Sequence, residues 1–168
     1  MNAATLIVFS GLPGAGKTTI AQMLAAEVDA SYIQVDIIED VLLQGAETGV
    51  VGAEGYLVGY AMAQANLALG RTIIADAVNA EEGARDGWRL AARKTGSRIL
   101  PFEIFCSEAS QHEARLRDRP WPFKAQANPD WKTVTSRVWE PWQEDVMRLD
   151  TSKLTISECV SAIRQALI

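Results

Sequence analysis

A glycine-rich turn near the N-terminus has the residue types and spacing needed to hold phosphate. Residues 11–18 read GLPGAGKT and match the pattern G-x-x-x-x-G-K-[ST], between a predicted strand and a predicted helix. Glycines permit backbone angles that direct successive N–H groups at phosphate oxygens, and the N-terminus of the following helix adds positive charge. The pattern therefore predicts a phosphate-binding loop that holds a nucleotide.

Individual residues of this loop have separate predicted roles. We expect Lys17 to reach the β- and γ-phosphates and the Thr18 hydroxyl to bind Mg²⁺. The predicted cofactors are ATP and Mg²⁺, although the motif only weakly separates ATP from GTP. The loop residues predicted to bind the nucleotide are Gly11, Gly14, Ala15, Gly16, Lys17, Thr18 and Thr19.

Two aspartates end predicted strands further along the chain. Asp36 closes the segment YIQVD and Asp76 closes the segment TIIAD. Ligands of parallel α/β sheets bind at the carboxyl ends of the strands, so both aspartates should face the phosphate loop. Asp76 suits the metal side, and Asp36 suits a base that accepts a proton from an attacking hydroxyl or orients it. The alternative for each is a helix N-cap.

The elements that must position these residues alternate along the chain. Short apolar runs predict strands over 5–10, 32–36, 72–76, 98–106 and around 146–149, and helical patterns fall near 17–28, 37–44, 54–69, 81–95, 108–118, 130–147 and 157–167. This alternation predicts an α/β fold with a parallel sheet and helices on both faces. We find no linker, so residues 1–168 are predicted to form one domain.

Charge and composition narrow the class of ligand. The net charge is −5 and the pI is near 4.9, so nucleic acid is an improbable partner. The chain has one histidine, which argues against a histidine-based metal site, and its start lacks the features of a signal or membrane helix, which predicts a cytoplasmic protein without a membrane partner. The sequence does not decide between a monomer and a homodimer. Positive charge is concentrated in residues 111–137, which suggests that a small anionic ligand binds there. The basic residues of this segment are Arg115, Arg117, Arg119, Lys124, Lys132 and Arg137.

Beyond the loop, the sequence resembles the small P-loop kinases, the group that includes adenylate, shikimate and gluconate kinases. It is most similar to the short kinases often labelled AAA family ATPases, which include chloramphenicol phosphotransferase-like proteins. The segments that carry the resemblance are GLPGAGKTT, VDIIEDVL, ALGRTIIADAVN, CSEASQHEARLRDRP and RLDTS. The resemblance implies a three-layer P-loop NTPase fold, a sheet in the order 2-3-1-4-5 and a short lid at about residues 115–130.

The resemblance also implies roles for single residues. Asp36 would be the base and Asp76 the metal-side carboxylate, with Asn79 near the substrate. Arg115 and Arg119 would be lid arginines that stabilise the transferred phosphoryl group or stack on adenine. The alternative for this arginine pair is the solvated face of an amphipathic helix.

The acceptor side is less well defined. Many relatives carry an arginine three residues after the strand-2 aspartate, but here that residue is Glu39, which favours a neutral or cationic acceptor unless its side chain faces solvent. Tyr56 and Tyr60, one helical turn apart, could line the acceptor pocket. Trp121, in the predicted lid, could cover adenine, stack on an aromatic acceptor or pack within the fold. The other tryptophans fit helix packing: Trp88, Trp131, Trp139 and Trp142.

Together these features predict an ATP-dependent phosphotransferase that acts on a hydroxyl group of a small metabolite or antibiotic. The predicted catalytic residues are Lys17, Asp36, Arg115 and Arg119. A switch or motor NTPase would need a glutamate directly after the metal-side aspartate, where this chain has Ala77. A polynucleotide 5′-hydroxyl kinase is the third alternative, and the acidic pI counts against it.

Overall fold

A five-stranded parallel sheet forms the centre of the molecule. The computed structural model describes residues 4–47 and 49–168. The strands are β1 (Thr5–Ser10), β2 (Ser31–Gln34), β3 (Ile73–Asp76), β4 (Arg98–Phe105) and β5 (Met147–Asp150). They lie in the order β2-β3-β1-β4-β5, and each neighbouring pair is parallel. The predicted strand order is therefore confirmed.

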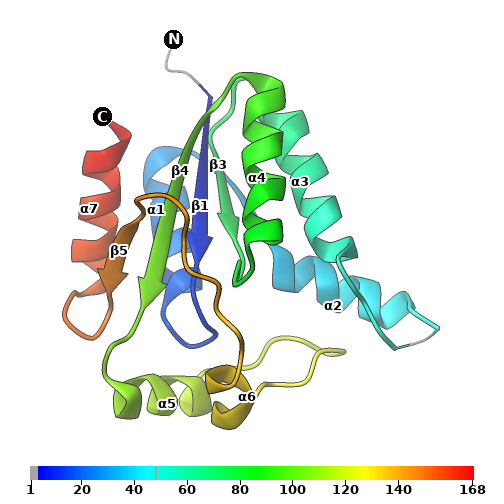
Figure 1. Cartoon of the computed structure of the whole chain (residues 1–168), viewed down its shortest axis with the longest axis vertical. Helices are drawn as coiled ribbons and strands as arrows, with labels where there is room; N and C mark the ends of the chain where they lie inside the picture. The colour runs from blue at the N-terminus through cyan, green and yellow to red at the C-terminus, as the bar shows by residue number, and fades with distance from the viewer. Residues whose placement is uncertain (1–3, 48) are drawn as a thin grey trace.

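Helices cover both faces of this sheet, as predicted. They are α1 (Lys17–Val28), α2 (Val35–Gly45), α3 (Glu54–Leu67), α4 (Glu82–Thr95), α5 (Ala109–Asp118), α6 (Trp131–Thr135) and α7 (Ile156–Leu167). Figure 1 shows α1 and α7 on one face and α3 and α4 on the other. It also shows α5 and α6 beyond the ends at which the strands finish, where they cover the carboxyl edge of the sheet.

Strand β1 joins two apolar layers because its side chains alternate between the faces of the sheet. Ile7 and Phe9 belong to the cluster that also contains Leu24 of α1. Leu6 and Val8 belong to the opposite cluster, which also contains the fully buried Trp88 of α4. All six residues of β1 are buried, as expected for a parallel strand with both faces covered. This rigid strand leads directly into the phosphate loop.

Helix α2 begins earlier than the sequence suggests. Strand β2 ends at Gln34, and Asp36 lies in the first turn of α2, so the prediction that Asp36 closes a strand is wrong. A carboxylate in the first turn of a helix is favoured by the positive end of the helix dipole. Asp36 therefore still lies at the carboxyl edge of the sheet, but a helix presents it.

The prediction of a helix over 130–147 is also wrong, because only Trp131–Thr135 is helical. Asp130 begins this short helix by accepting a hydrogen bond from the Thr133 N–H at 2.8 Å. Residues 136–146 have no helix, and their path is set instead by contacts with Arg85 of α4. Trp139 and Trp142 lie in this irregular segment and stack on Arg85, so their predicted helix packing is wrong as well.

Within residues 4–47 and 49–168, no helix combines the length and the apolar character needed to cross a bilayer.

Candidate active site

The glycine loop approaches other parts of the chain so closely that side chains would not fit. Gly11 has φ 151°, and a Cβ atom there would collide with the carbonyl oxygen of Ile104 in β4. Gly14 has φ 83° and lies against His112 of α5, whose Nε2 is 2.8 Å from the carbonyl oxygen of Pro13. The loop is thus held between the end of β4 and helix α5, with α1 starting at Lys17.

Lys17 is buried in this loop. Only 7% of the residue is exposed, and its ammonium group donates a hydrogen bond to the carbonyl oxygen of Leu12 at 3.1 Å. Burial lowers the pKa of Lys17, while the charges of Asp76 and Asp36 raise it. Lys17 therefore contacts the loop and is close enough to both predicted carboxylates for their charges to act on it, as expected for a lysine that holds β- and γ-phosphates.

Thr18 and Asp76 form the predicted metal side of the site. The Thr18 hydroxyl donates to Asp76 Oδ2 at 2.7 Å, and the buried Asp76 also accepts from the Tyr32 hydroxyl at 2.8 Å. In the described part of the chain, no group of three or more His, Cys, Asp or Glu side chains forms a metal site. Thr18 and Asp76 nevertheless fit Mg²⁺, because this ion commonly takes one or two protein carboxylates and completes its shell with water and substrate phosphate.

Tyr32 was not predicted as a site residue. Its hydroxyl donates to Asp76 and contacts Gln34 at 3.1 Å, and burial together with the Asp76 charge raises its pKa. Tyr32 and Asp76 lie on neighbouring strands, β2 and β3, so only the strand order reveals their contact. The tyrosine orients the carboxylate that is predicted to bind the metal.

Asp36, in the first turn of α2, is close enough to Lys17 and Asp76 for their charges to act on it. Burial raises the pKa of Asp36; the ammonium of Lys17 lowers it, and the Asp76 carboxylate raises it further. The structure thus brings both predicted aspartates to the phosphate loop from different elements. A carboxylate whose pKa is raised is a stronger proton acceptor than an ordinary aspartate.

Glu39 follows Asp36 by one helical turn and is half-buried rather than turned to solvent. It packs against Gly55 of α3, where a Cβ atom would collide with the Glu39 side chain. Burial raises the pKa of Glu39 to about 7, with a further contribution from Asp36 and an opposing one from Arg137. Nearby, the Tyr56 hydroxyl accepts a hydrogen bond from the Asn79 N–H at 3.1 Å, and burial raises its pKa to about 12.

Asn79 and Tyr60 lie beneath the site. The fully buried Asn79 donates to the carbonyl oxygen of Phe9 at 2.8 Å and accepts from Trp88 Nε1 at 2.9 Å. The Tyr60 hydroxyl donates to the carbonyl oxygen of Ala84 at 2.7 Å, and its ring packs edge-on against Trp88. The Asn79 amide and the Tyr60 hydroxyl are therefore both hydrogen-bonded within the protein. Contact of either side chain with a substrate stays a prediction.

Arg115 links helix α5 to the loop after β5. Its guanidinium donates to the hydroxyl of Thr151 at 2.8 Å and to the carbonyl oxygen of the same residue at 2.9 Å. Thr151 in turn donates to the carbonyl oxygen of Ala15 at 2.8 Å. Arg115 is therefore connected to the phosphate loop through Thr151, while its role toward adenine or phosphate stays a prediction.

Arg119 follows α5 directly. Because residues 115–118 of the predicted lid belong to α5, we use the term lid for residues 119–130. The Arg119 guanidinium lies 4.7 Å from the Trp121 ring centroid and donates to Asn128 Oδ1 at 3.1 Å. Its Nε atom is buried without a hydrogen-bond partner, and burial lowers its pKa against the opposing charge of Asp36. A buried donor without a partner at a phosphate loop fits an oxygen of a bound phosphate.

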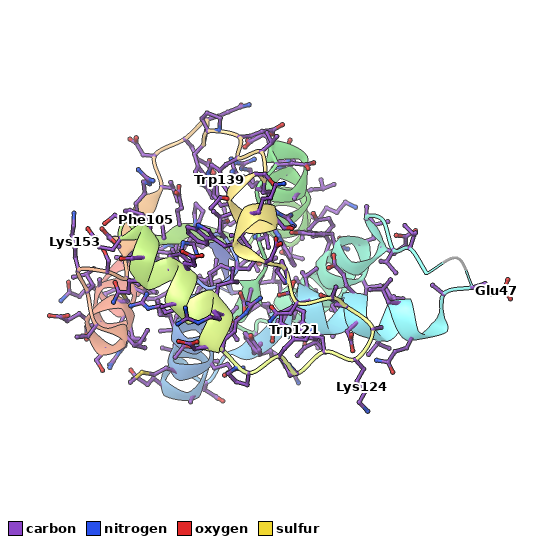
Figure 2. All side chains as sticks on the ribbon, turned by 90° about the horizontal axis from the view of Figure 1, so that it is seen from below. Glu47, Phe105, Trp121, Lys124, Trp139 and Lys153 are labelled. Carbon is purple, nitrogen blue, oxygen red and sulfur yellow. The ribbon has the colours of Figure 1, made fainter. Side chains whose placement is uncertain are left out.

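Asp40 fastens the lid to α2, and the sequence did not suggest this role. Its carboxylate accepts from the backbone N–H groups of Ala125 at 2.7 Å and Gln126 at 3.0 Å. Desolvation raises the pKa of Asp40, but these hydrogen bonds outweigh it and hold the pKa below its ordinary value. Within the lid, Trp121 Nε1 donates to the carbonyl oxygen of Gln126 at 2.9 Å, and Figure 2 shows Trp121 beside α2.

Arg137 is a further basic residue of the site, noted in the sequence only as part of the basic segment. It follows α6, and its charge lies close enough to the site to lower the pKa of Lys17, Asp36 and Glu39. The charge of Arg137 therefore acts on residues of both the predicted phosphate side and the predicted acceptor side. Its distance of about a hundred residues from Asp36 in the chain hides this electrostatic effect from any local pattern.

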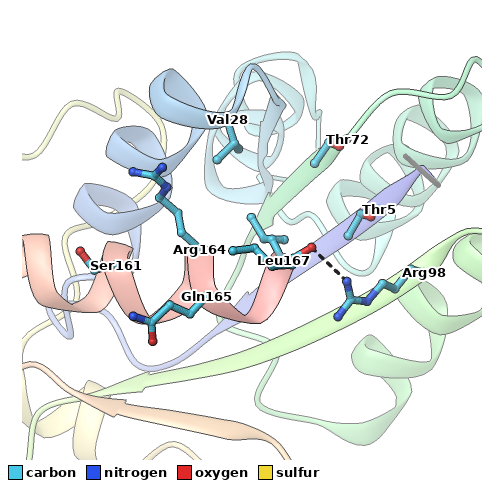
Figure 3. A pocket seen from close by; sticks show the side chains of 9 residues that line it. Thr5, Val28, Thr72, Arg98, Ser161, Arg164, Gln165 and Leu167 are labelled. Carbon is cyan, nitrogen blue, oxygen red and sulfur yellow. Dashed lines mark hydrogen bonds between the residues drawn. The ribbon is translucent and has the colours of Figure 1, made fainter. Parts of the chain in front are cut away.

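Two cavities help to locate the site. One of about 160 Å³ adjoins the phosphate loop and is lined by residues that include Gly11, Ala15, His112 and Trp139. Another, of about 770 Å³, lies at the opposite end of the sheet, where Thr5 and Arg98 begin their strands. Figure 3 shows Arg98 in this second cavity, donating to the carbonyl oxygen of Leu167. The predicted site residues lie at the carboxyl edge, away from the second cavity.

The sheet order, the glycine loop and the Lys17–Thr18–Asp76 arrangement define a P-loop protein. Residues 6–146 match the sequence profile of the AAA domain family, and the chain belongs to that family. No curated protein matches the chain in sequence.

Solved structures share the fold over nearly the whole chain. A protein described as a kinase from Chloroflexus aurantiacus has a TM-score of 0.76 at 20% identity, covering 99% of this chain and 97% of its own. APS kinase CysC of Mycobacterium tuberculosis, in complex with AMPPNP and APS, has a TM-score of 0.74 at 14% identity, covering 99% of both chains. A gluconokinase from Sinorhizobium meliloti has a TM-score of 0.68 at 17% identity, covering 99% of this chain and 93% of its own. The resemblance to small P-loop kinases is thus confirmed.

Proposed function

We propose that this protein is an ATP-dependent phosphotransferase that moves the γ-phosphoryl group of MgATP to a hydroxyl group of a small molecule. The observation that carries the proposal is the placement of two carboxylates around Lys17. Asp76 is hydrogen-bonded to Thr18, while Asp36 approaches from α2 and makes no such bond. One carboxylate is then assigned to the metal and the other to an acceptor.

The proposed reaction uses these groups in separate roles. The loop and Lys17 hold the phosphates, and bound Mg²⁺, held by Thr18 and Asp76, would neutralise charge on the phosphate oxygens. Asp36 accepts the proton of the acceptor hydroxyl as its oxygen bonds to the γ-phosphorus. The bond from that phosphorus to the bridging oxygen breaks, and ADP leaves. Arg119, whose Nε lacks a partner, stabilises the transferred group.

The alternative of a switch or motor NTPase has less support at this site. Such an enzyme needs a group that positions the attacking water beside the metal-side carboxylate. Here Asp76 is followed by the buried Ala77, and the second carboxylate comes from the acceptor-side helix α2. A polynucleotide kinase would need a basic, strand-binding surface, which the net charge of −5 disfavours.

An ADP-release screen tests the proposal. The purified protein is supplied with MgATP and a panel of hydroxylated metabolites and antibiotics, and ADP is measured for each compound. We expect at least one compound to raise ADP release, and the Asp36→Asn variant to lose that increase while it still binds ADP. Asp29→Asn is the matched control, because Asp29 is an exposed C-cap residue of α1. If no compound raises ADP release above the level of the Asp36→Asn variant, the proposal is wrong.

A further inference from the structure

Gln126 of the lid is bonded to helix α2 through both its side chain and its backbone. Its Nε2 donates a hydrogen bond to the carbonyl oxygen of Asp36 at 2.6 Å, and its backbone N–H donates to Asp40 Oδ1 at 3.0 Å. Its carbonyl oxygen accepts from Trp121 Nε1 at 2.9 Å. Gln126 therefore joins the lid to the first two turns of α2, where Asp36 lies.

The part of the lid around Gln126 is itself held in place. Asp40 also accepts from the backbone N–H of Ala125 at 2.7 Å. The Trp121 ring packs edge-on against Phe123, with 4.8 Å between the ring centroids. The Gln126 amide is thus presented to α2 by a turn that is bonded to this helix and packed within itself.

A glutamine suits this place because its amide is neutral and offers a donor. The first two turns of α2 carry three carboxylates, at Asp36, Glu39 and Asp40, which would repel an acidic residue in the lid. A carbonyl oxygen has two lone pairs, so that of Asp36 can accept from Gln126 in addition to the helix N–H four residues further on. The lid can therefore bond to α2 without breaking the helix.

The two predicted carboxylates of the site are held differently. The Asp76 carboxylate accepts from the hydroxyls of Thr18 and Tyr32. Within residues 4–47 and 49–168, the Asp36 carboxylate makes no hydrogen bond or ion pair, so its direction depends on the α2 backbone that carries it. Gln126 bonds to that backbone at Asp36 itself.

We propose that Gln126 is a positioning residue for phosphoryl transfer to the acceptor: its amide holds the first turn of α2 to the lid, and thereby holds the Asp36 carboxylate toward the acceptor hydroxyl. The inference rests on the proposed function, in which Asp36 accepts the proton of that hydroxyl. A reacting group displaced by about 1 Å can slow a reaction by about 100-fold. Loss of the Gln126 bond should therefore lower the rate of transfer more than the binding of either substrate.

The rate test uses Gln126→Met, which keeps the length of the side chain but removes its amide. With an acceptor found in the ADP-release screen, we expect kcat to fall about ten-fold, while the acceptor KM and the ADP dissociation constant change by less than about two-fold. Gln126→Lys keeps a donor that can reach the Asp36 carbonyl oxygen and should restore most of kcat. Gln143→Met changes an exposed glutamine outside the lid and is the matched control.

Amide hydrogen exchange tests the same link without an acceptor. We expect residues 36–41 to exchange faster in Gln126→Met than in the original protein, because the first turn of α2 loses its bond to the lid. Exchange in α7, on the other face of the sheet, should be the same in both proteins.

Three results would overturn the proposal. Unchanged exchange in residues 36–41 would show that Gln126 does not hold α2. A fall in ADP affinity as large as the fall in kcat would mean that the variant only destabilises the lid, and a Gln126→Lys variant as slow as Gln126→Met would mean that the donor is not needed. If the screen finds no acceptor, the proposed function fails, whereas the exchange measurement still decides whether Gln126 holds α2.

Discussion

The predicted phosphate side and the predicted acceptor side of this site are built in different ways. The phosphate side comes from one continuous stretch, residues 11–18, completed by Asp76 from the adjacent strand β3. The predicted acceptor side combines α2, the start of α3 and the lid. A continuous loop is positioned by its own backbone, whereas the acceptor side depends on contacts between distant segments. Changes on the two sides should therefore affect catalysis differently.

Loss of the phosphate lysine should have the largest effect. We expect Lys17→Ala to lower ATP turnover by about a thousand-fold, because no other buried cation approaches the loop as closely among the described residues. Steady-state ADP release measures the effect, with the exposed Lys94→Ala as the control. Turnover within a few-fold of the original protein would contradict the role assigned to this lysine.

Loss of the acceptor-side carboxylate should spare the phosphate side. We expect Asp36→Asn to lower acceptor-dependent turnover by about a hundred-fold, while ADP affinity is retained. Measuring the rate and the ADP dissociation constant on the same sample separates the two sides. If ADP affinity falls together with the rate, Asp36 belongs to the nucleotide site and the two sides are not separate.

Release of the lid should have a smaller effect than loss of a charged group at the reaction centre. Asp40→Ala removes the acceptor of two backbone N–H groups in the lid, so Arg119 is held less firmly, and we expect turnover to fall by about ten-fold. Limited proteolysis should then cut within residues 119–130 faster than before. Glu27→Ala, which loses only a surface ion pair, is the control for proteolysis and rate. An unchanged cleavage pattern would show that Asp40 does not hold the lid.

The smallest predicted effect is on stability and comes from Glu39. Its pKa rises from 4.5 in the unfolded chain to about 7 in the folded protein, so the folded state binds the proton more tightly and loses stability as pH rises through this range. Glu39→Gln should therefore be more stable than the original protein at pH 8 by about 1 kcal/mol, allowing for solvent screening of a half-exposed carboxylate.

Urea unfolding at pH 8 and pH 4 measures this difference. The advantage of Glu39→Gln should disappear at the lower pH, where the carboxyl group is protonated in both states. The exposed Glu113→Gln should show no such pH dependence. An equal effect of Glu39→Gln at both pH values would mean that the ionised carboxylate is not destabilised by its surroundings.

Much of the fold could be predicted because its signals are local. Apolar runs flanked by turns located all five strands, and strand β1 leads into the glycine loop where the motif requires it. The predicted helix over 130–147 was wrong because Trp139 and Trp142 pack around Arg85 of α4, a contact that no local pattern contains. The same reason explains why Asp36 was placed at the end of a strand, since the start of α2 depends on where β2 stops pairing with β3.

The sequence by itself determined the phosphate side: the loop, Lys17 and Thr18 are neighbours in the chain, and their chemistry follows from backbone angles and one helix N-terminus. Only the tertiary structure decided the acceptor side. It turned Glu39 inward against Gly55, engaged Asn79 with Trp88 and fastened the lid through Asp40. These contacts join residues far apart in the chain, and their formation depends on packing of the whole sheet and its helices rather than on local propensity.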